Sequence, residues 1–81
     1  MSDQMVHVYY QPGCPFAAKL RAKLTLSRIP YEAVRFRDDE AAAEQARLHN
    51  GGNEVSPTVL VSGQYLTNPT VRQVRRAVAR T

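Results

Sequence analysis

Hydrophobic residues recur along this chain at two spacings, one typical of strands and the other of helices. The segment Met5–Tyr10 is rich in β-branched and aromatic residues, which favours a strand. After a turn at Pro12 and Gly13, hydrophobic residues recur every four positions through Phe16–Leu24, with basic side chains between them. This spacing predicts an amphipathic helix. Pro15 suits its first position, where the missing N–H removes no hydrogen bond.

The next segment predicts a second strand beside the first. Pro30 cannot continue the helix, so the helix is expected to end over Ser27–Pro30. Tyr31–Phe36 then alternates apolar and polar residues, as a half-buried strand does. Two strands joined by a crossover helix form a βαβ unit, in which the strands are parallel and the connection is right-handed.

A second helix is expected from the acidic run Asp38–Glu40, which suits the positive end of a helix dipole. The alanine-rich segment through Leu48 has high helix propensity, and the glycines of Asn50–Asn53 supply a left-handed cap. The acidic run could instead be a metal site. No further ligands stand near it in the sequence, so helix capping is favoured.

The rest of the chain predicts a hairpin and a last helix. Thr58–Val61 is expected to be a third strand, and a tight turn leads into a short fourth strand at Gln64–Leu66. Asn68 is the expected N-cap, and Pro69 the first residue, of a helix that runs to about Ala79. The predicted order is βαβ, α, ββ, α, which is an α/β fold.

The chain of 81 residues has a net charge of +4 and a pI near 9.7, which raises the question of a nucleic-acid partner. Four arginines near the end of the sequence supply much of the excess positive charge. No nucleic-acid motif accompanies them, so no nucleic-acid partner is expected. On a helix they face away from three valines, which favours the solvated side of a packed helix. A docking surface for an acidic partner or substrate is the alternative. The arginines are Arg72, Arg75, Arg76 and Arg80, and the valines are Val71, Val74 and Val78.

Length and composition predict one domain spanning residues 1–81, with 43% hydrophobic residues. No N-terminal segment resembles a signal peptide, and no apolar stretch approaches the roughly 20 residues needed to cross a bilayer. We therefore expect a soluble cytoplasmic protein that works in a reducing compartment without a membrane partner.

Reactive chemistry centres on Cys14, the only cysteine, at the expected junction of strand and helix. At the N-cap, its thiolate could accept hydrogen bonds from the backbone N–H groups of Phe16 and Ala17 and would sit at the positive end of the helix dipole. Both effects favour a pKa below the free value of roughly 8.5 and predict a reactive nucleophile. The alternative is an inert buried cysteine.

This element order, with a cysteine opening the first helix and a proline just before the third strand, resembles the thioredoxin fold. More narrowly, the chain resembles the glutaredoxins, and among them the actinobacterial mycoredoxin-like group. The matching segments are Pro12–Phe16, Asn50–Val59 and Leu66–Pro69. The resemblance implies a four-stranded mixed sheet flanked by three helices, and the activity of a thiol–disulfide oxidoreductase.

The resemblance also implies a site. Cys14 matches the nucleophile of the family, and Pro57 matches a proline whose preceding peptide bond is cis, which places the backbone of Ser56 against the active sulfur. Thr67 and Asn68 match the loop that completes the cleft for a small thiol. The other residues expected to bind substrate are Gln11, Pro12, Gly13, Pro15 and Phe16.

Ala17 departs from the family, because the dithiol members carry Cys-x-x-Cys and a second cysteine at this position. With no resolving thiol, the resemblance implies monothiol exchange, in which Cys14 takes a small thiol from a mixed disulfide. Ala17 is either natural or an engineered replacement of a resolving cysteine. The implied partners are S-thiolated proteins or low-molecular-weight mixed disulfides, and we expect a monomer.

Two small thiols are candidate co-substrates, mycothiol and glutathione. Glutathione-using relatives often carry a lysine three positions before the cysteine, where this chain has Gln11, and an acid at the loop that here contains Thr67 and Asn68. Mycothiol has an acetylated amine and a sugar and needs neither charge, so it is favoured. No tightly bound cofactor is expected, and His7 and His49 with one cysteine form no zinc pattern.

Two other functions remain open at this point. One is a non-enzymatic redox sensor or adaptor that becomes thiolated at Cys14 and docks through its arginines. The other is a monothiol glutaredoxin that shares an iron–sulfur cluster between two subunits. Such relatives usually carry Cys-Gly-Phe-Ser, from which Pro15 and Ala17 depart.

Overall fold

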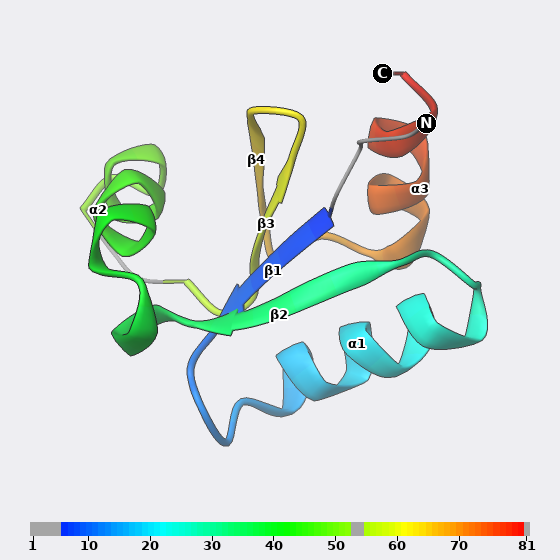
Figure 1. The fold of residues 1–81 in the computed structure, drawn as a ribbon, viewed down its shortest axis with the longest axis horizontal. Helices are drawn as coiled ribbons and strands as arrows, with labels where there is room; N and C mark the ends of the chain where they lie inside the picture. Colours follow the sequence, from blue (N-terminus) through cyan, green and yellow to red (C-terminus); the bar gives the residue numbers. More distant parts are fainter. Residues whose placement is uncertain (1–5, 53–54, 81) are drawn as a thin grey trace.

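The computed structural model describes residues 6–52 and 55–80, and these form four strands, three α-helices and one short 3₁₀ helix (Figure 1). The order predicted from the sequence, βαβ, α, ββ, α, is confirmed. Met5 and Asn53, which were expected to belong to the first strand and to a helix cap, lie outside the described residues. The elements are β1 Val6–Tyr10, α1 Pro15–Leu26, β2 Tyr31–Arg35, the 3₁₀ helix η1 Phe36–Asp38, α2 Glu40–His49, β3 Thr58–Val61, β4 Gln64–Thr67 and α3 Val71–Ala79.

The strands form one mixed sheet in the order β2-β1-β3-β4. β1 pairs parallel with β2 and antiparallel with β3, so that Val8 lies between Ala33 and Val59. β3 and β4 pair antiparallel across a tight turn in which Ser62 and Gly63 both have positive φ, 49° and 83°. Such turns match the twist of the flanking strands. The predicted four-stranded mixed sheet is therefore confirmed.

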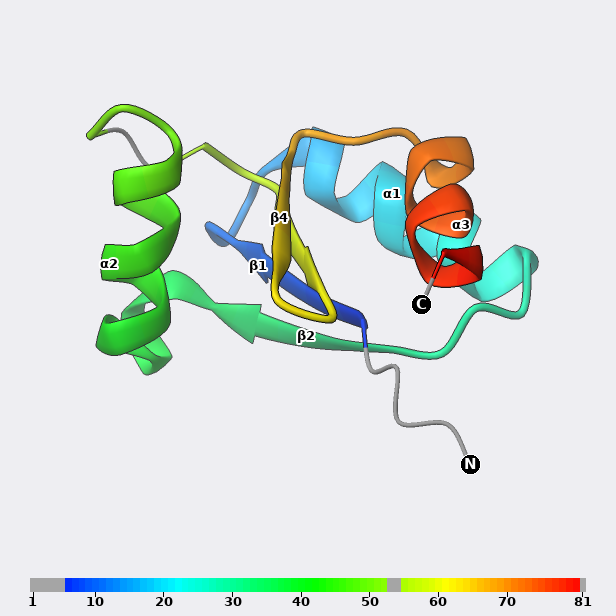
Figure 2. The ribbon, with the colours of Figure 1, turned by 90° about the horizontal axis from the view of Figure 1, so that it is seen from above.

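The helices cover both faces of the sheet. α1 and α3 pack on one face, and α2 packs on the other (Figures 1 and 2). Because side chains alternate along a strand, each strand supplies both faces. Val6 and Val8 of β1 point to the α1 and α3 side, whereas Tyr9 points to the α2 side.

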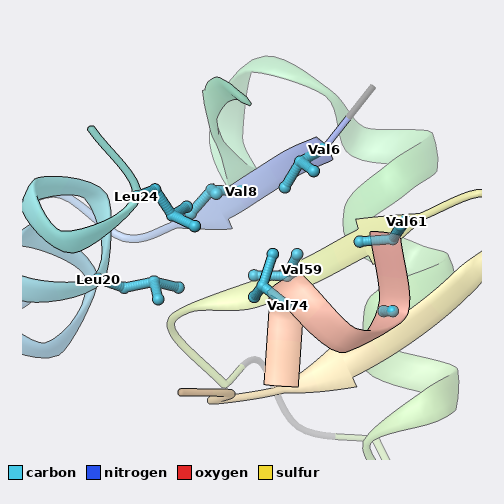
Figure 3. Close-up of a cluster of buried hydrophobic side chains, with 8 residues drawn as sticks. Val6, Val8, Leu20, Leu24, Val59, Val61 and Val74 are labelled. Atoms are coloured by element: carbon cyan, nitrogen blue, oxygen red, sulfur yellow. The ribbon is translucent and has the colours of Figure 1, made fainter. Parts of the chain in front are cut away.

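This alternation produces two hydrophobic clusters. The larger one joins valines of β1 and β3 to leucines of α1 and to α3 (Figure 3). Its buried members are Val6, Val8, Leu20, Leu24, Val59, Val61, Val74 and Ala77. The smaller one, on the α2 side, consists of Tyr9, Phe36, Ala43 and Ala46. The sheet is thus held between two apolar layers of unequal size.

Phe36 corrects one predicted boundary. The alternation of apolar residues placed it in the second strand, but β2 ends at Arg35 and Phe36 begins the 3₁₀ helix. Its ring is buried beside Tyr9, with ring centroids 6.2 Å apart. Burial rather than strand pairing therefore accounts for the apolar residue at this position. The helix that follows begins as expected in the acidic run, where the Asp39 side chain accepts a hydrogen bond from the backbone N–H of Ala42.

The start of the last helix corrects a second prediction. Asn68 is not the N-cap, because α3 begins at Val71 and Thr70 caps it. Thr70 and Gln73 form a reciprocal capping box, with bonds of 3.1 and 2.8 Å. Asn68 instead has a left-handed backbone, φ 46°, and donates its N–H to the carbonyl of Pro57 at 2.8 Å.

The arginines of α3 and the residue after it are exposed, whereas Val74 and Ala77 on the same helix are buried. The prediction of a helix with one solvated basic side is confirmed. Among the described residues, no helix has both the length and the apolar character required to cross a membrane.

Leu24 and Leu26 provide a matched test of the larger cluster. Leu24 is 0% exposed and Leu26 is 83% exposed, although both belong to α1. Replacing Leu24 by Ala should lower the free energy of unfolding by about 2–5 kcal/mol, because the loss of buried surface leaves a cavity. Leu26→Ala should change it by less than about 0.5 kcal/mol. Urea denaturation of both variants measures the difference, and equal losses would contradict this packing.

Candidate active site

Cys14 lies where the loop after β1 enters α1. Its backbone is extended, with φ −79° and ψ 117°, and it is the N-cap of the helix, as the sequence predicts. Its carbonyl accepts the N–H of Ala18 at 3.2 Å, and its own N–H donates to the carbonyl of Gln11 at 3.2 Å. Gly13, with φ 85°, makes the reversal that precedes it. The side chain of Cys14 is half-buried.

Ser56 approaches this loop from the start of β3. Its peptide bond to Pro57 is cis, as the resemblance predicts, and its carbonyl oxygen lies 3.5 Å from the sulfur of Cys14, which donates to it. The Ser56 hydroxyl accepts the backbone N–H of Gln11 at 3.0 Å. Ser56 therefore holds both the reactive sulfur and the loop that carries it.

The pKa of the Cys14 thiol is lowered from its ordinary value. The largest cause is a hydrogen bond from the Ser56 side chain to the sulfur. Partial burial opposes this effect, and the backbone N–H groups of Ala17 and Phe16 at the start of α1 support it. The Cys14 side chain makes no capping hydrogen bond of its own, so we attribute the contribution of these two amides to their field on the thiolate. The site therefore favours a nucleophilic thiolate.

The residues expected to bind a small thiol do not form one pocket. Phe16, which is 63% exposed, and Asn68 line a groove of about 220 Å³ between α1 and the loop before α3. Lys19 and Lys23 also line this groove. On the other side of the Cys14 loop, Gln11 and Pro12 line a cavity of about 270 Å³. Its other lining residues are Tyr10, Phe36, Arg37 and Glu40. The loop thus lies between two concave surfaces.

Asn50 is a structural residue of the site that the sequence did not predict in this role. Its side-chain amide donates to the Thr58 hydroxyl at 3.2 Å, and its side-chain oxygen accepts the Thr67 hydroxyl. Thr58 is fully buried and donates in turn to the carbonyl of Val55 at 2.5 Å. One amide at the end of α2 therefore ties together β3 and β4. In the sequence this residue stands before two glycines, and that position indicates only a helix end.

The contacts of Thr67 bear directly on its expected role. Thr67 ends β4, one residue beyond the predicted strand, and its hydroxyl is already held by Asn50. Asn68, the next residue, is exposed and lies in the groove with Phe16. Both residues are exposed, but the Thr67 hydroxyl is already bonded to Asn50, whereas Asn68 lines the open groove.

Neither histidine contacts Cys14. His7 lies 3.5 Å from Glu32 and stacks on Tyr9, and His49 packs against Tyr65. In the described part of the chain, no group of three or more histidine, cysteine, aspartate or glutamate side chains could hold a metal ion. The activation of the thiol therefore comes from Ser56 and the start of α1.

Comparisons with known proteins identify relatives of this arrangement. The family model described as glutaredoxin matches residues 6–66. "Putative glutaredoxin Rv3198A" of Mycobacterium tuberculosis H37Rv is 38% identical over 69 residues, which are 84% of this chain and 82% of that protein. "Putative glutaredoxin MT3292" of M. tuberculosis CDC 1551 matches with the same identity and coverage.

Solved structures show the same fold. The crystal structure of the thioredoxin-like protein BC3987 matches with a TM-score of 0.67 and 25% identity, covering 89% of this chain and 97% of that one. The crystal structure of a glutaredoxin from Archaeoglobus fulgidus matches with a TM-score of 0.72 and 12% identity, covering 93% of this chain and 86% of that one. The predicted thioredoxin-like fold is confirmed.

Ser56→Ala tests the cause of the lowered thiol pKa. The variant removes the hydrogen bond that contributes most to lowering it, so the pKa of Cys14 should rise towards its ordinary value. The rate of iodoacetamide alkylation, followed against pH, should then have its midpoint at higher pH and be slower at neutral pH. Ser27→Ala, at the other end of α1, is the control and should leave the midpoint unchanged. An unshifted midpoint in Ser56→Ala would remove Ser56 from the activation of the thiol.

Proposed function

The chain belongs to the glutaredoxin family, and we propose on this premise that it reduces protein–mycothiol mixed disulfides by monothiol exchange at Cys14. The observation that carries the proposal is the half-buried sulfur of Cys14 at the start of α1, held against Ser56 with a lowered pKa. A thiolate in this setting is a nucleophile for disulfide exchange.

In the first step of the proposed reaction, the Cys14 thiolate attacks the sulfur of the small thiol in the mixed disulfide. A bond forms between Cys14 and that sulfur while the original disulfide bond breaks, and the target protein leaves as a thiolate that takes a proton from solvent. A lowered pKa increases the ionised fraction of the attacking sulfur, because the Ser56 hydroxyl and the start of α1 stabilise its charge.

In the second step, the thiolate of another small-thiol molecule attacks the small-thiol sulfur now bound to Cys14. Cys14 leaves as a thiolate, and the two small thiols depart as their own disulfide. The target protein is thereby reduced by two electrons, which the two small thiols supply as they become oxidised. The same low pKa that favours attack makes Cys14 a good leaving group.

Ala17 supports a mechanism with a single protein thiol. It is 1% exposed and occupies the position of the second cysteine in dithiol relatives. Because Cys14 is the only cysteine of the chain, the intermediate cannot be resolved by an internal disulfide. A free small thiol must therefore complete the cycle.

The groove lined by Phe16 and Asn68 bears on which small thiol is used. Among its lining residues are Lys19 and Lys23, and none is acidic. The absence of an acid leaves the ammonium group of glutathione without a partner in this groove, which supports mycothiol because its amine is acetylated. The two lysines, in contrast, can pair with the carboxylates of glutathione, so the choice of mycothiol rests on the missing acid and on the family resemblance. The neutral polar side chains of Gln11 and Asn68 suit the hydroxyl groups of a sugar.

The proposal is tested by incubating the protein with a mycothiolated peptide and, separately, with the matching glutathionylated peptide. Intact mass and released thiol are followed while free small thiol is added. We expect an adduct of mycothiol on Cys14 that clears on adding mycothiol, with repeated turnover, and complete loss of both in Cys14→Ser.

The other outcomes separate the alternatives. An adduct that forms and persists would indicate a redox sensor, and faster turnover with glutathione would overturn the choice of mycothiol. Retained exchange in Cys14→Ser would exclude Cys14 as the nucleophile. A brown protein with visible absorbance after anaerobic purification would instead favour a shared iron–sulfur cluster.

Ala17→Cys tests whether the site still supports a dithiol mechanism. Residues three apart in the first turn of a helix are close enough to be bridged by a disulfide. The oxidised variant should lose two hydrogen atoms in its intact mass and should accumulate less of the small-thiol adduct. Ala22→Cys, exposed on the same helix, is the control and should form no internal disulfide. If Ala17→Cys forms no disulfide, the geometry of this turn excludes a dithiol mechanism and allows only monothiol exchange.

A further inference from the structure

Negative charge is confined to one part of the described chain, which leaves the rest with an excess of positive charge. The segments 6–30 and 55–80 contain all of β1, α1, β3, β4 and α3, and they carry eight lysines and arginines and no aspartate or glutamate. The acidic residues of the described segments all lie between Glu32 and Glu44, in β2, the 3₁₀ helix and α2. α1 and α3 cover one face of the sheet and α2 the other (Figure 2), so the helices on the two faces differ in charge.

Among the described residues, no acidic side chain pairs with the arginines of α3 or with Arg80 just after it. The ion pairs among the described residues involve His7, Arg35 and Arg47, which contact acids of β2, the 3₁₀ helix and α2. Arg76 and Arg80 are exposed, and neither takes part in any of these pairs. Their position near the end of α3 complements the helix dipole. The helix dipole does not account for the other polar side chains that surround these two arginines.

That surface is a groove between α3 and β4. It has a volume of about 180 Å³, and its lining consists of Gln64 and Leu66 of β4 with Gln73, Arg76, Ala77 and Arg80 of the α3 side. Two guanidinium groups and two amides can donate hydrogen bonds around a floor formed by Leu66 and Ala77. β4 is an outer strand of the sheet, paired only with β3 in the described segments. The groove is therefore open to a chain that runs alongside β4.

We propose that this groove binds an extended acidic segment of a partner protein. Arg76 and Arg80 are one helical turn apart, about 6 Å along the axis. Alternate residues of an extended chain are separated by about 6.6 Å and point to the same side. Carboxylates at alternate positions can thus each meet one guanidinium in a two-pronged hydrogen bond, while the intervening backbone lies over Leu66 and Ala77.

The composition of the groove favours a protein over a nucleic acid. Proteins that bind single-stranded nucleic acids combine basic side chains with aromatic rings on which bases stack. The groove has no aromatic side chain among its lining residues. Its two glutamine side chains and its apolar floor suit a peptide backbone and small side chains.

The groove lies at the end of the sheet away from Cys14. Gln64 pairs with Val61 at the hairpin end of β4, whereas Thr67 at the other end pairs with Thr58, close to Pro57. Arg76 lies in the second half of α3 and Arg80 directly follows the helix, so both are beyond the loop that borders the Phe16 groove. A segment bound between α3 and β4 therefore leaves the sulfur of Cys14 accessible. The binding site does not depend on the proposed thiol exchange.

The test uses the full chain and a fluorescent peptide in which glutamate alternates with threonine, Glu-Thr-Glu-Thr-Glu. Binding is followed by fluorescence anisotropy at low salt, and a peptide with glutamine in place of glutamate shows whether the carboxylates are needed. The variant R76Q/R80Q should bind the acidic peptide at least tenfold more weakly. R72Q/R75Q is the matched control, because it removes the same charge from the same helix outside the groove, and it should weaken binding by no more than about twofold.

Amide chemical shifts locate the peptide independently of affinity. Addition of the peptide should shift the amide signals of Gln64, Leu66, Gln73 and Ala77 and leave that of Cys14 unchanged. Equal weakening by the two double variants would show a diffuse electrostatic attraction and would overturn the proposal. Absence of peptide binding would also overturn the proposal. The same holds if a single-stranded oligonucleotide binds more tightly than the peptide and both double variants weaken its binding equally. Thermal unfolding of both variants checks that each remains folded.

Discussion

The pairing of β1 with β3 is the constraint on which this structure depends. Tyr9 lies opposite Thr58, so the loop that leaves β1 and the segment that enters β3 meet at the same edge of the sheet. That register brings Cys14 to Ser56, 42 residues away in the sequence. The same register directs the valines of both strands to α1 and α3. A slip by one residue would reverse the faces of the strand, so one pairing determines both the core and the site.

The sequence correctly predicted the elements whose structure follows from the residues nearby in the chain. The strand of Val6–Tyr10, the four-residue spacing in α1 and the turn before β4 all follow from local pattern. The prediction for Asn68 is wrong because its residue type suits an N-cap, whereas its backbone N–H bonds to Pro57 in a distant segment. Phe36 was assigned to a strand because an apolar residue continues the alternation wherever it is buried. Both errors arise where tertiary contacts override local preference.

The site divides in the same way. The N-cap position of Cys14 could be predicted from the residues next to it, because a turn and a proline precede a clear helix. The contact with Ser56 followed from the family resemblance, since no local pattern links residues so far apart. Neither the local pattern nor the family resemblance predicted the role of Asn50. Its role depends on two hydroxyl groups that only the folded sheet brings together, Thr58 and Thr67.

Ala17, buried where a second cysteine would lie, has an electrochemical consequence. A protein with two neighbouring cysteines has its own two-electron reduction potential, set by the relative stabilities of its dithiol and disulfide forms. This chain has one cysteine thiol and therefore no internal dithiol–disulfide couple. In the proposed reaction, the fraction of Cys14 in a mixed disulfide would depend on the concentrations of the reduced and oxidised small thiol around it. The surroundings would then set the redox state of the protein, and the fold would adjust the rate of exchange and the stability of the mixed disulfide.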